Sequence, residues 1–121
     1  KKQVAGARVG VLGLTFKENV PDLRNSKVPD IIAELGEFGI TPLVHDPLAN
    51  ADAAREEYGL TLSPLASFVG LDAVVLAVGH SSYLKDLPGL VSTLAPGGIL
   101  VDVKSVFQPA SLPAGLVYWS L

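Results

Sequence analysis

The sequence contains no cysteine, and this absence removes three kinds of chemistry at once. Disulfides, thiolate metal sites and cysteine nucleophiles are all excluded within this chain. Charged residues are also scarce, at 17% of the sequence, where a typical domain has about 25%. Such a composition predicts either a well-buried sheet or an apolar face that normally meets another domain.

Long apolar runs are missing as well. None approaches the roughly 18 residues of a transmembrane helix, and the start of the chain, KKQVAGARVGVLGL, lacks the pattern of a signal peptide. Nine basic and twelve acidic side chains give a net charge of -3, which does not favour a nucleic-acid-binding protein. We therefore expect one compact cytoplasmic domain over residues 1–121, with no membrane or nucleic-acid partner.

Short apolar segments alternate with helical patterns along the chain. The first helix is expected to begin at a cap on Asn25 or Ser26, with Pro29 in its first turn, and to end at Gly39. This alternation predicts an α/β fold of three α/β/α layers, with a parallel Rossmann-like sheet of about five strands in the order 3-2-1-4-5. The expected strands, in chain order, are 7–14, 40–46, 60–63, 72–78 and 99–103, and the tail GLVYWSL could add an edge strand.

Polar residues gather where three of these strands end. Phe16 and Lys17 follow the first strand, His80 follows the fourth, and Lys104 follows the fifth. Ligands of such sheets bind outside the carboxyl ends of the strands, near the point where the strand order reverses. Two lysines beside the amino end of a helix suit an anion, most naturally a phosphate. An isolated lysine at a strand end is more often simply solvated, but clustering at this position favours a site.

The glycine-rich loops of common nucleotide-binding proteins are missing. A dinucleotide fingerprint needs G-x-G-x-x-G directly after the first strand, whereas Gly10 and Gly13 lie inside the strand run. There is also no G-x-x-x-x-G-K-[ST] loop. His45 and His80 stand at different strand ends without metal-ligand spacing, so no metal site is expected. The chain thus has a dinucleotide-binding shape without the dinucleotide-binding loop.

The segment GLTFKENVPDLRNSKVPDIIAEL strongly resembles the start of the carboxy-terminal, nucleotide-binding domain of the UDP-glucose/GDP-mannose dehydrogenase family. The family pattern is roughly G-L-x-F-K-x-x-x-x-D-x-R-x-S followed by a helix. The sequence of this segment is most similar to the branch that oxidises UDP-N-acetylhexosamines. The later blocks VHDPLA, AVGHSSYLKDL and VDVKSVF also resemble family segments. One departure is Ser120, which stands where members of this branch often have a basic residue.

The resemblance implies one domain of a larger enzyme. Family members also have an amino-terminal NAD-binding domain and a central helical domain used in dimerisation, and their catalytic cysteine lies upstream. The whole enzyme would oxidise C6 of a UDP-sugar from alcohol to carboxylate with NAD as cofactor, making UDP-uronic acids for surface polysaccharide. This chain alone would hold no catalytic residue. The sugar is left open among glucose and the N-acetylated hexosamines, and the enzyme could be a homo-oligomer.

The resemblance also assigns roles to residues of the substrate site. Phe16 and Lys17 would contact the UDP-sugar, and Lys104 would lie near the sugar or the phosphate. His80 would shape the pocket. From its chemistry alone, Phe16 could either stack on a flat ring or cover the edge of the core.

For the cofactor, the resemblance implies that Arg24 reaches across a domain gap to NAD held by the missing domain, with Asp22 orienting it. The alternative for Arg24 is an ordinary surface ion pair with Asp22 or Glu18, which would contribute little to stability. Two other functions stay open: a stand-alone Rossmann-like binding or interaction module without catalysis, and a complete NAD-binding regulator. The missing glycine-rich loop disfavours the regulator.

Overall fold

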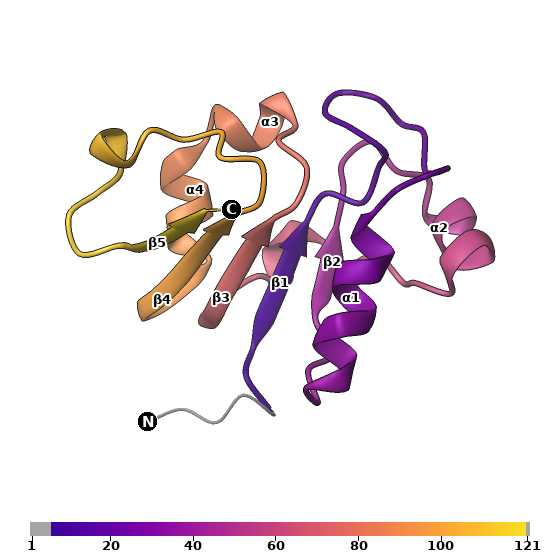
Figure 1. Ribbon diagram of the computed structural model, residues 1–121, viewed down its shortest axis with the longest axis horizontal. Helices are drawn as coiled ribbons and strands as arrows, with labels where there is room; N and C mark the ends of the chain where they lie inside the picture. The colour runs from indigo at the N-terminus through magenta and orange to yellow at the C-terminus, as the bar shows by residue number, and fades with distance from the viewer. Residues whose placement is uncertain (1–5, 121) are drawn as a thin grey trace.

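A five-stranded parallel sheet runs through the middle of the molecule (Figure 1). The computed structural model describes residues 6–120. The strands lie in the order β2-β1-β3-β4-β5, and every neighbouring pair is parallel. Their bounds are β1 (Val9–Leu12), β2 (Leu43–His45), β3 (Leu71–Leu76), β4 (Leu94–Asp102) and β5 (Val117–Ser120). The predicted α/β fold with a parallel Rossmann-like sheet is confirmed.

Helices lie on both faces of this sheet. Successive strand residues point to opposite sides, so both faces carry apolar side chains that the helices cover. Figure 1 shows α1 on the viewer's side of β1 and β2, and α4 behind β4 and β5. Val9, Val11 and Val75 belong to the core cluster under α1, whereas Val74 and Leu100 belong to the cluster under α4. The helical elements are α1 (Val28–Glu37), α2 (Ala51–Tyr58), η1 (Leu65–Ser67), α3 (Ser81–Leu84), α4 (Leu87–Ser92) and η2 (Pro109–Ser111). Within residues 6–120, no helix is long and apolar enough to cross a membrane.

The strand predicted at 60–63 is wrong. This segment runs beside β2, and the N–H of Ser63 donates to the carbonyl of Val44 at 2.6 Å, but no strand forms there. Pro64 follows directly and has no N–H with which to continue a ladder. The fifth place in the sheet belongs instead to β5 at the opposite edge, where the tail was expected to add a strand. The order of the four remaining strands is as predicted.

The ends of α1 follow the local signals in the sequence. The Ser26 hydroxyl accepts the N–H of Val28 at 3.2 Å and donates to the carbonyl of Leu14 at 2.6 Å. This contact ties the start of the helix to the chain that leaves β1, although the first residue before the helix is Lys27. Pro29 lies in the first turn, as predicted. Gly39 follows the helix with φ of 79°, the left-handed conformation that ends many helices.

One face of the sheet has little cover. Among the described residues, η2 is the only helical element between β4 and β5, and Figure 1 shows the viewer's side of both strands bare. Ile99 pairs with Val117 and Val101 with Trp119, so these side chains share that face. Trp119 is 57% exposed. An apolar face of this kind is one of the two alternatives that the low charge content predicted.

Candidate functional site

A small cavity lies at the carboxyl ends of β1, β3 and β4, beside the first turn of α1. Its volume is about 70 Å³. Apolar side chains form much of its wall, and three lysines reach it from three different segments. It is lined by Thr15, Phe16, Lys17, Lys27, Val28, Ile31, Ala77, Val78, Val103 and Lys104. The structure thus brings together Phe16, Lys17 and Lys104, the three residues predicted for the substrate site.

The cavity carries a concentrated positive charge. None of the ion pairs within residues 6–120 involves Lys17, Lys27 or Lys104. The amino end of α1 adds the partial positive charge of its free N–H groups. A bound anion would be attracted to this positive charge. Sequence reasoning missed Lys27; its position at the start of α1 was the available signal, since anions bind at helix amino ends.

The loop that follows β1 is held in place by the chain leaving β2. Gly13 has φ of 99°, and a Cβ there would lie 2.6 Å from Cβ of Val78, so glycine is required at this bend. The next two backbone N–H groups, of Leu14 and Thr15, both donate to Oδ2 of Asp46, at 2.7 and 3.0 Å. The loop that carries Phe16 and Lys17 therefore starts from a fixed direction.

Asp46 is the buried carboxylate that organises this end of the sheet. Its Oδ1 accepts the N–H groups of Leu48 and Ala49, at 2.8 and 3.2 Å, and its Oδ2 also lies 2.9 Å from Nε2 of His80. Burial by itself would raise the pKa of Asp46, but these hydrogen bonds, led by that from the Leu14 N–H, stabilise the charged form and hold the pKa below its usual value. Sequence analysis identified the segment VHDPLA without finding this role.

His80 lies behind the cavity wall. Its side chain is 1% exposed, and its Nε2 is 3.1 Å from Oγ1 of Thr15, a residue that does line the cavity. His80 therefore does not line the cavity itself but contacts Thr15, which does. The prediction that it shapes the pocket stays a prediction.

Arg24 lies outside the cavity, on the exposed surface of the same loop. Its Nε and Nη2 contact the two carboxylate oxygens of Asp22, at 3.1 and 3.2 Å. The hydrogen bond from the Arg24 side chain lowers the pKa of Asp22, and the carboxylate raises the pKa of Arg24 in return. Within residues 6–120, Arg24 thus makes the surface ion pair given above as the alternative, and its predicted contact with NAD stays a prediction.

Lys104 is positioned by a second buried carboxylate. Asp102 ends β4 and accepts the N–H groups of Val106 and Phe107, at 3.0 and 2.9 Å, and the hydroxyl of Tyr118 at 2.6 Å. These bonds close a turn over residues 103–105 and carry Lys104 to the cavity. Asp102 itself is fully buried and does not line the cavity. Its role here is to fold the turn.

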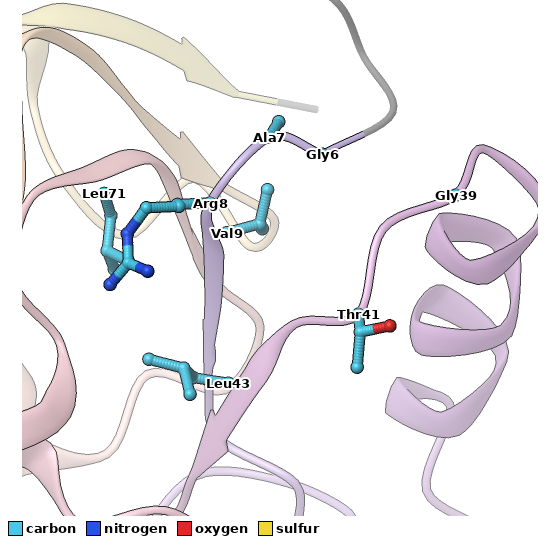
Figure 2. Close-up of a pocket in the computed structure, with 8 residues that line it drawn as sticks. All are labelled: Gly6, Ala7, Arg8, Val9, Gly39, Thr41, Leu43 and Leu71. Carbon is cyan, nitrogen blue, oxygen red and sulfur yellow. The ribbon is translucent and has the colours of Figure 1, made fainter.

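A second hollow lies at the opposite end of the strands (Figure 2). Its volume is about 340 Å³, and Arg8 is its charged lining residue. In Figure 2 the Arg8 side chain extends toward Leu71, and its Nη2 donates to the carbonyl of Val69 at 3.2 Å. Ligands of open parallel sheets bind at the other end, outside the carboxyl ends of the strands. The smaller cavity is therefore the better candidate site.

The described part of the chain shows no grouping of His, Cys, Asp or Glu that could hold a metal ion. NAD is also a poor fit to this chain by itself. The turn after β1 contains Thr15, Phe16 and Lys17 in place of the glycines that would let a pyrophosphate approach the backbone.

A comparison with protein families identifies this arrangement. The model of the UDP-glucose/GDP-mannose dehydrogenase family, UDP binding domain, matches residues 10–109, a range that includes every residue lining the small cavity. The chain belongs to this family. The resemblance inferred from the first motif is therefore confirmed.

Individual relatives agree with the family match. The chain is 39% identical over 119 residues to Protein CapL of Staphylococcus aureus, which covers 98% of this chain and 28% of CapL. It is 51% identical over 80 residues to the UDP-N-acetyl-D-glucosamine 6-dehydrogenase of Pseudomonas aeruginosa, which covers 66% of this chain and 19% of that enzyme. The chain therefore spans less than a third of the length of these curated relatives.

Solved structures show the same fold. The crystal structure of NDP-N-acetyl-D-galactosaminuronic acid dehydrogenase from Methanosarcina mazei Go1 superposes with a TM-score of 0.80 at 24% identity, covering 98% of this chain and 25% of that one. A UDP-glucose dehydrogenase from Pyrobaculum islandicum gives 0.69 at 29% identity, covering 95% and 25%. In each case the sheet and its helices match about a quarter of a longer protein.

Proposed function

We propose that this chain is the carboxy-terminal domain of an NAD-dependent nucleotide-sugar 6-dehydrogenase, that it spans residues 1–121, and that it binds the UDP part of the substrate. The observation that carries the proposal is the convergence of Phe16, Lys17, Lys27 and Lys104 on one cavity, in a chain of the UDP-binding family. The chain contributes no catalytic residue, because the reaction takes place on the sugar, next to other domains.

The chemistry of the cavity suits a diphosphate. Lysine is a flexible point charge, and three lysines at a helix amino end can follow the several oxygens of a diphosphate. A well-placed hydrogen bond between charged groups is worth about 1.5–3 kcal/mol. Phe16 is 48% exposed and offers an apolar surface to the uracil or the sugar.

The size of the cavity indicates a shared site. Pockets that enclose a small molecule usually measure about 300–1,000 Å³, whereas this one measures about 70 Å³. The chain can therefore surround only part of a nucleotide sugar, and the remaining domains would complete the pocket. The bare apolar face of β4 and β5 offers a surface for packing against those domains. We propose that the partners of this chain are the other domains of the same enzyme. We also propose that the whole enzyme forms a homo-oligomer in the cytoplasm.

The substrate that we favour is a UDP-N-acetylhexosamine. This choice rests on relatives, of which one at 51% identity is named a UDP-N-acetyl-D-glucosamine 6-dehydrogenase. UDP-glucose is the alternative, because UDP-glucose 6-dehydrogenases are also relatives, one at 32% identity.

NAD would be held by another part of the enzyme. Its role there is to accept hydride from C6 of the sugar. The exposed guanidinium of Arg24 is free to turn outward from Asp22, because the arginine side chain is 80% exposed. We propose that Arg24 contacts the NAD pyrophosphate across the domain gap, with Asp22 orienting the guanidinium.

A titration of the isotope-labelled chain with UDP tests this proposal. We expect the amide signals of Phe16, Lys17, Lys27 and Lys104 to shift together, with a dissociation constant near the millimolar scale, about -4 kcal/mol. Uridine and inorganic phosphate should each bind more weakly, and NAD should give no tight binding. Shifts confined to the hollow around Arg8, or no shifts at tens of millimolar UDP, would show that the proposal is wrong.

A further inference from the structure

The imidazole of His80 joins three segments that are far apart in the sequence. Its Nδ1 accepts the backbone N–H of Asn19 at 2.9 Å. Its Nε2 lies 2.9 Å from Oδ2 of Asp46 and 3.1 Å from Oγ1 of Thr15. The ring therefore connects the end of β3 with the end of β2 and with both ends of the segment 15–19, which carries Phe16 and Lys17.

The geometry fixes which ring nitrogen carries the proton. A backbone N–H can only donate, so Nδ1 must be the unprotonated acceptor for Asn19. Nε2 then carries the hydrogen and donates to the Asp46 carboxylate, which has a negative charge. His80 is therefore held as the neutral tautomer with hydrogen on Nε2.

The same proton order continues through Thr15. The single hydrogen on Nε2 of His80 is shared between Oδ2 of Asp46 and Oγ1 of Thr15, so the threonine oxygen is an acceptor on that side. The Thr15 hydroxyl can therefore donate to the carbonyl of Lys17, 3.2 Å away. His80 is thus linked to the backbone carbonyl of Lys17 through the Thr15 hydroxyl, and it hydrogen-bonds directly to the backbone N–H of Asn19.

Asn19 is the point where the loop reverses. Its φ of 64° is left-handed, a conformation that asparagine tolerates better than most residues. Its side-chain Oδ1 accepts the N–H of Ser81 at 2.9 Å, while its own N–H is bound by His80. Two adjacent residues at the β3–α3 junction, His80 and Ser81, therefore both hydrogen-bond to Asn19. A proton on Nδ1 would place two N–H groups face to face and break one of these contacts.

We propose that His80 is a positioning residue for nucleotide binding. As the neutral tautomer, it holds residues 15–19 in the conformation that presents Phe16 and Lys17 to the cavity. The proposal rests on the proposed function for its ligand, but the hold on Asn19 is a property of this chain alone. The ionisable groups that face the ring are Asp46 from the end of β2, Tyr83 from α3, at 5.8 Å between ring centres, and the neighbouring His45.

Two substitutions separate the two sides of the ring. In His80→Gln, the longer side chain can still donate its amide to Asp46, but it has no acceptor at the position of Nδ1. In His80→Asn, the shorter side chain can accept the Asn19 N–H but does not reach Asp46. We expect His80→Gln to weaken UDP binding by about three- to tenfold and to speed hydrogen exchange of the Asn19 amide. We expect His80→Asn to keep more of both properties, at a greater loss of thermal stability.

The unsubstituted chain supplies a test that does not depend on these variants. Nitrogen NMR of the imidazole should show hydrogen on Nε2 and none on Nδ1 of His80, and the Asn19 amide should be protected from exchange. Hydrogen on Nδ1, a fast-exchanging Asn19 amide, or equal UDP affinity of His80→Gln and the unsubstituted chain would overturn the inference. A chain that does not bind UDP at all overturns the proposed function instead, while the tautomer and the Asn19 amide still decide whether His80 positions the loop.

Discussion

Arg24 and Asp22 contact each other at two points, with Nε and Nη2 of the arginine at 3.1 and 3.2 Å from the two carboxylate oxygens. Both groups are exposed, so the pair contributes little to folding. Arg55 and Asp52 form a second exposed pair on α2, at 3.5 Å, and provide a matched control.

We expect Arg24→Ala and Arg55→Ala to lower the melting temperature of the chain equally little, because both lose only an exposed ion pair. In the whole dehydrogenase, Arg24→Ala should raise the KM for NAD several-fold, whereas Arg55→Ala should leave it unchanged. Steady-state kinetics with varied NAD measure this difference. If the two variants have the same KM, Arg24 is a surface residue and its proposed contact with NAD is wrong.

Lys27 tests whether the cavity is the UDP site, because it was assigned to the site from the cavity lining and not from the sequence. We expect Lys27→Ala to weaken UDP binding by about fivefold, or about 1 kcal/mol, since one charged donor is lost. The loss should shrink as salt is added, because exposed charges are screened. Lys85→Ala is the control, since Lys85 is also exposed but does not line the cavity. Equal effects of both substitutions would mean that binding depends on net charge and not on this cavity.

Acid should destabilise the chain in two separate steps. Burial lowers the pKa of His45, whose Nδ1 lies 2.8 Å from the Tyr83 hydroxyl, so the folded state binds fewer protons there than the unfolded state. The stability from His45 is complete above the unfolded pKa of about 6.5 and falls as the pH drops from there to the lower folded pKa. The stability from Asp46 is complete above an unfolded pKa of about 3.9 and is lost as the pH falls through its lowered folded pKa.

Urea unfolding between about pH 8 and pH 3 measures both steps. His45→Asn should reduce the slope of unfolding free energy against pH just below about pH 6.5 and leave the step below about pH 4 in place. An unchanged upper slope in that variant would show that His45 does not cause it.

Asp102 is expected to be needed for both folding and binding. In Asp102→Asn, one oxygen becomes an NH₂ group that faces a backbone N–H of Val106 or Phe107. We expect a loss of about 1–3 kcal/mol in the free energy of unfolding, and weaker UDP binding because Lys104 is displaced. Tyr118→Phe removes only the hydroxyl and should cost about 1 kcal/mol with little change in binding. Urea unfolding and UDP titration of both variants check this order.

Local signals in the sequence were sufficient for most of the fold. The bend at Gly39 and the tail strand depend on residue type and alternation, which can be recognised in a single segment. The strand expected at 60–63 failed because alternation alone does not show whether a partner with free hydrogen-bonding groups is available. That question depends on β2 and on Pro64, and is settled only in the folded sheet.

The cavity was predicted in part. Strand ends predicted that Phe16, Lys17 and Lys104 lie together, because parallel strands bring their carboxyl ends to one edge, and all three line the cavity. Their role in binding stays a prediction. The supporting groups were not predicted. Asp46 receives N–H groups from the chain after β1 and from its own turn, and Asp102 receives a hydroxyl from β5, so both roles require long-range packing. A single sequence shows these carboxylates only as polar residues after a strand.

The bonds that set the path of the loop after β1 all come from the chain itself, through Asp46 and His80. A diphosphate that binds as proposed would therefore meet a loop whose backbone is already in place, and only the lysine side chains would have to move. Encounter should then proceed as fast as charge attraction allows. Differences between competing nucleotides should appear mainly in how long each one stays bound.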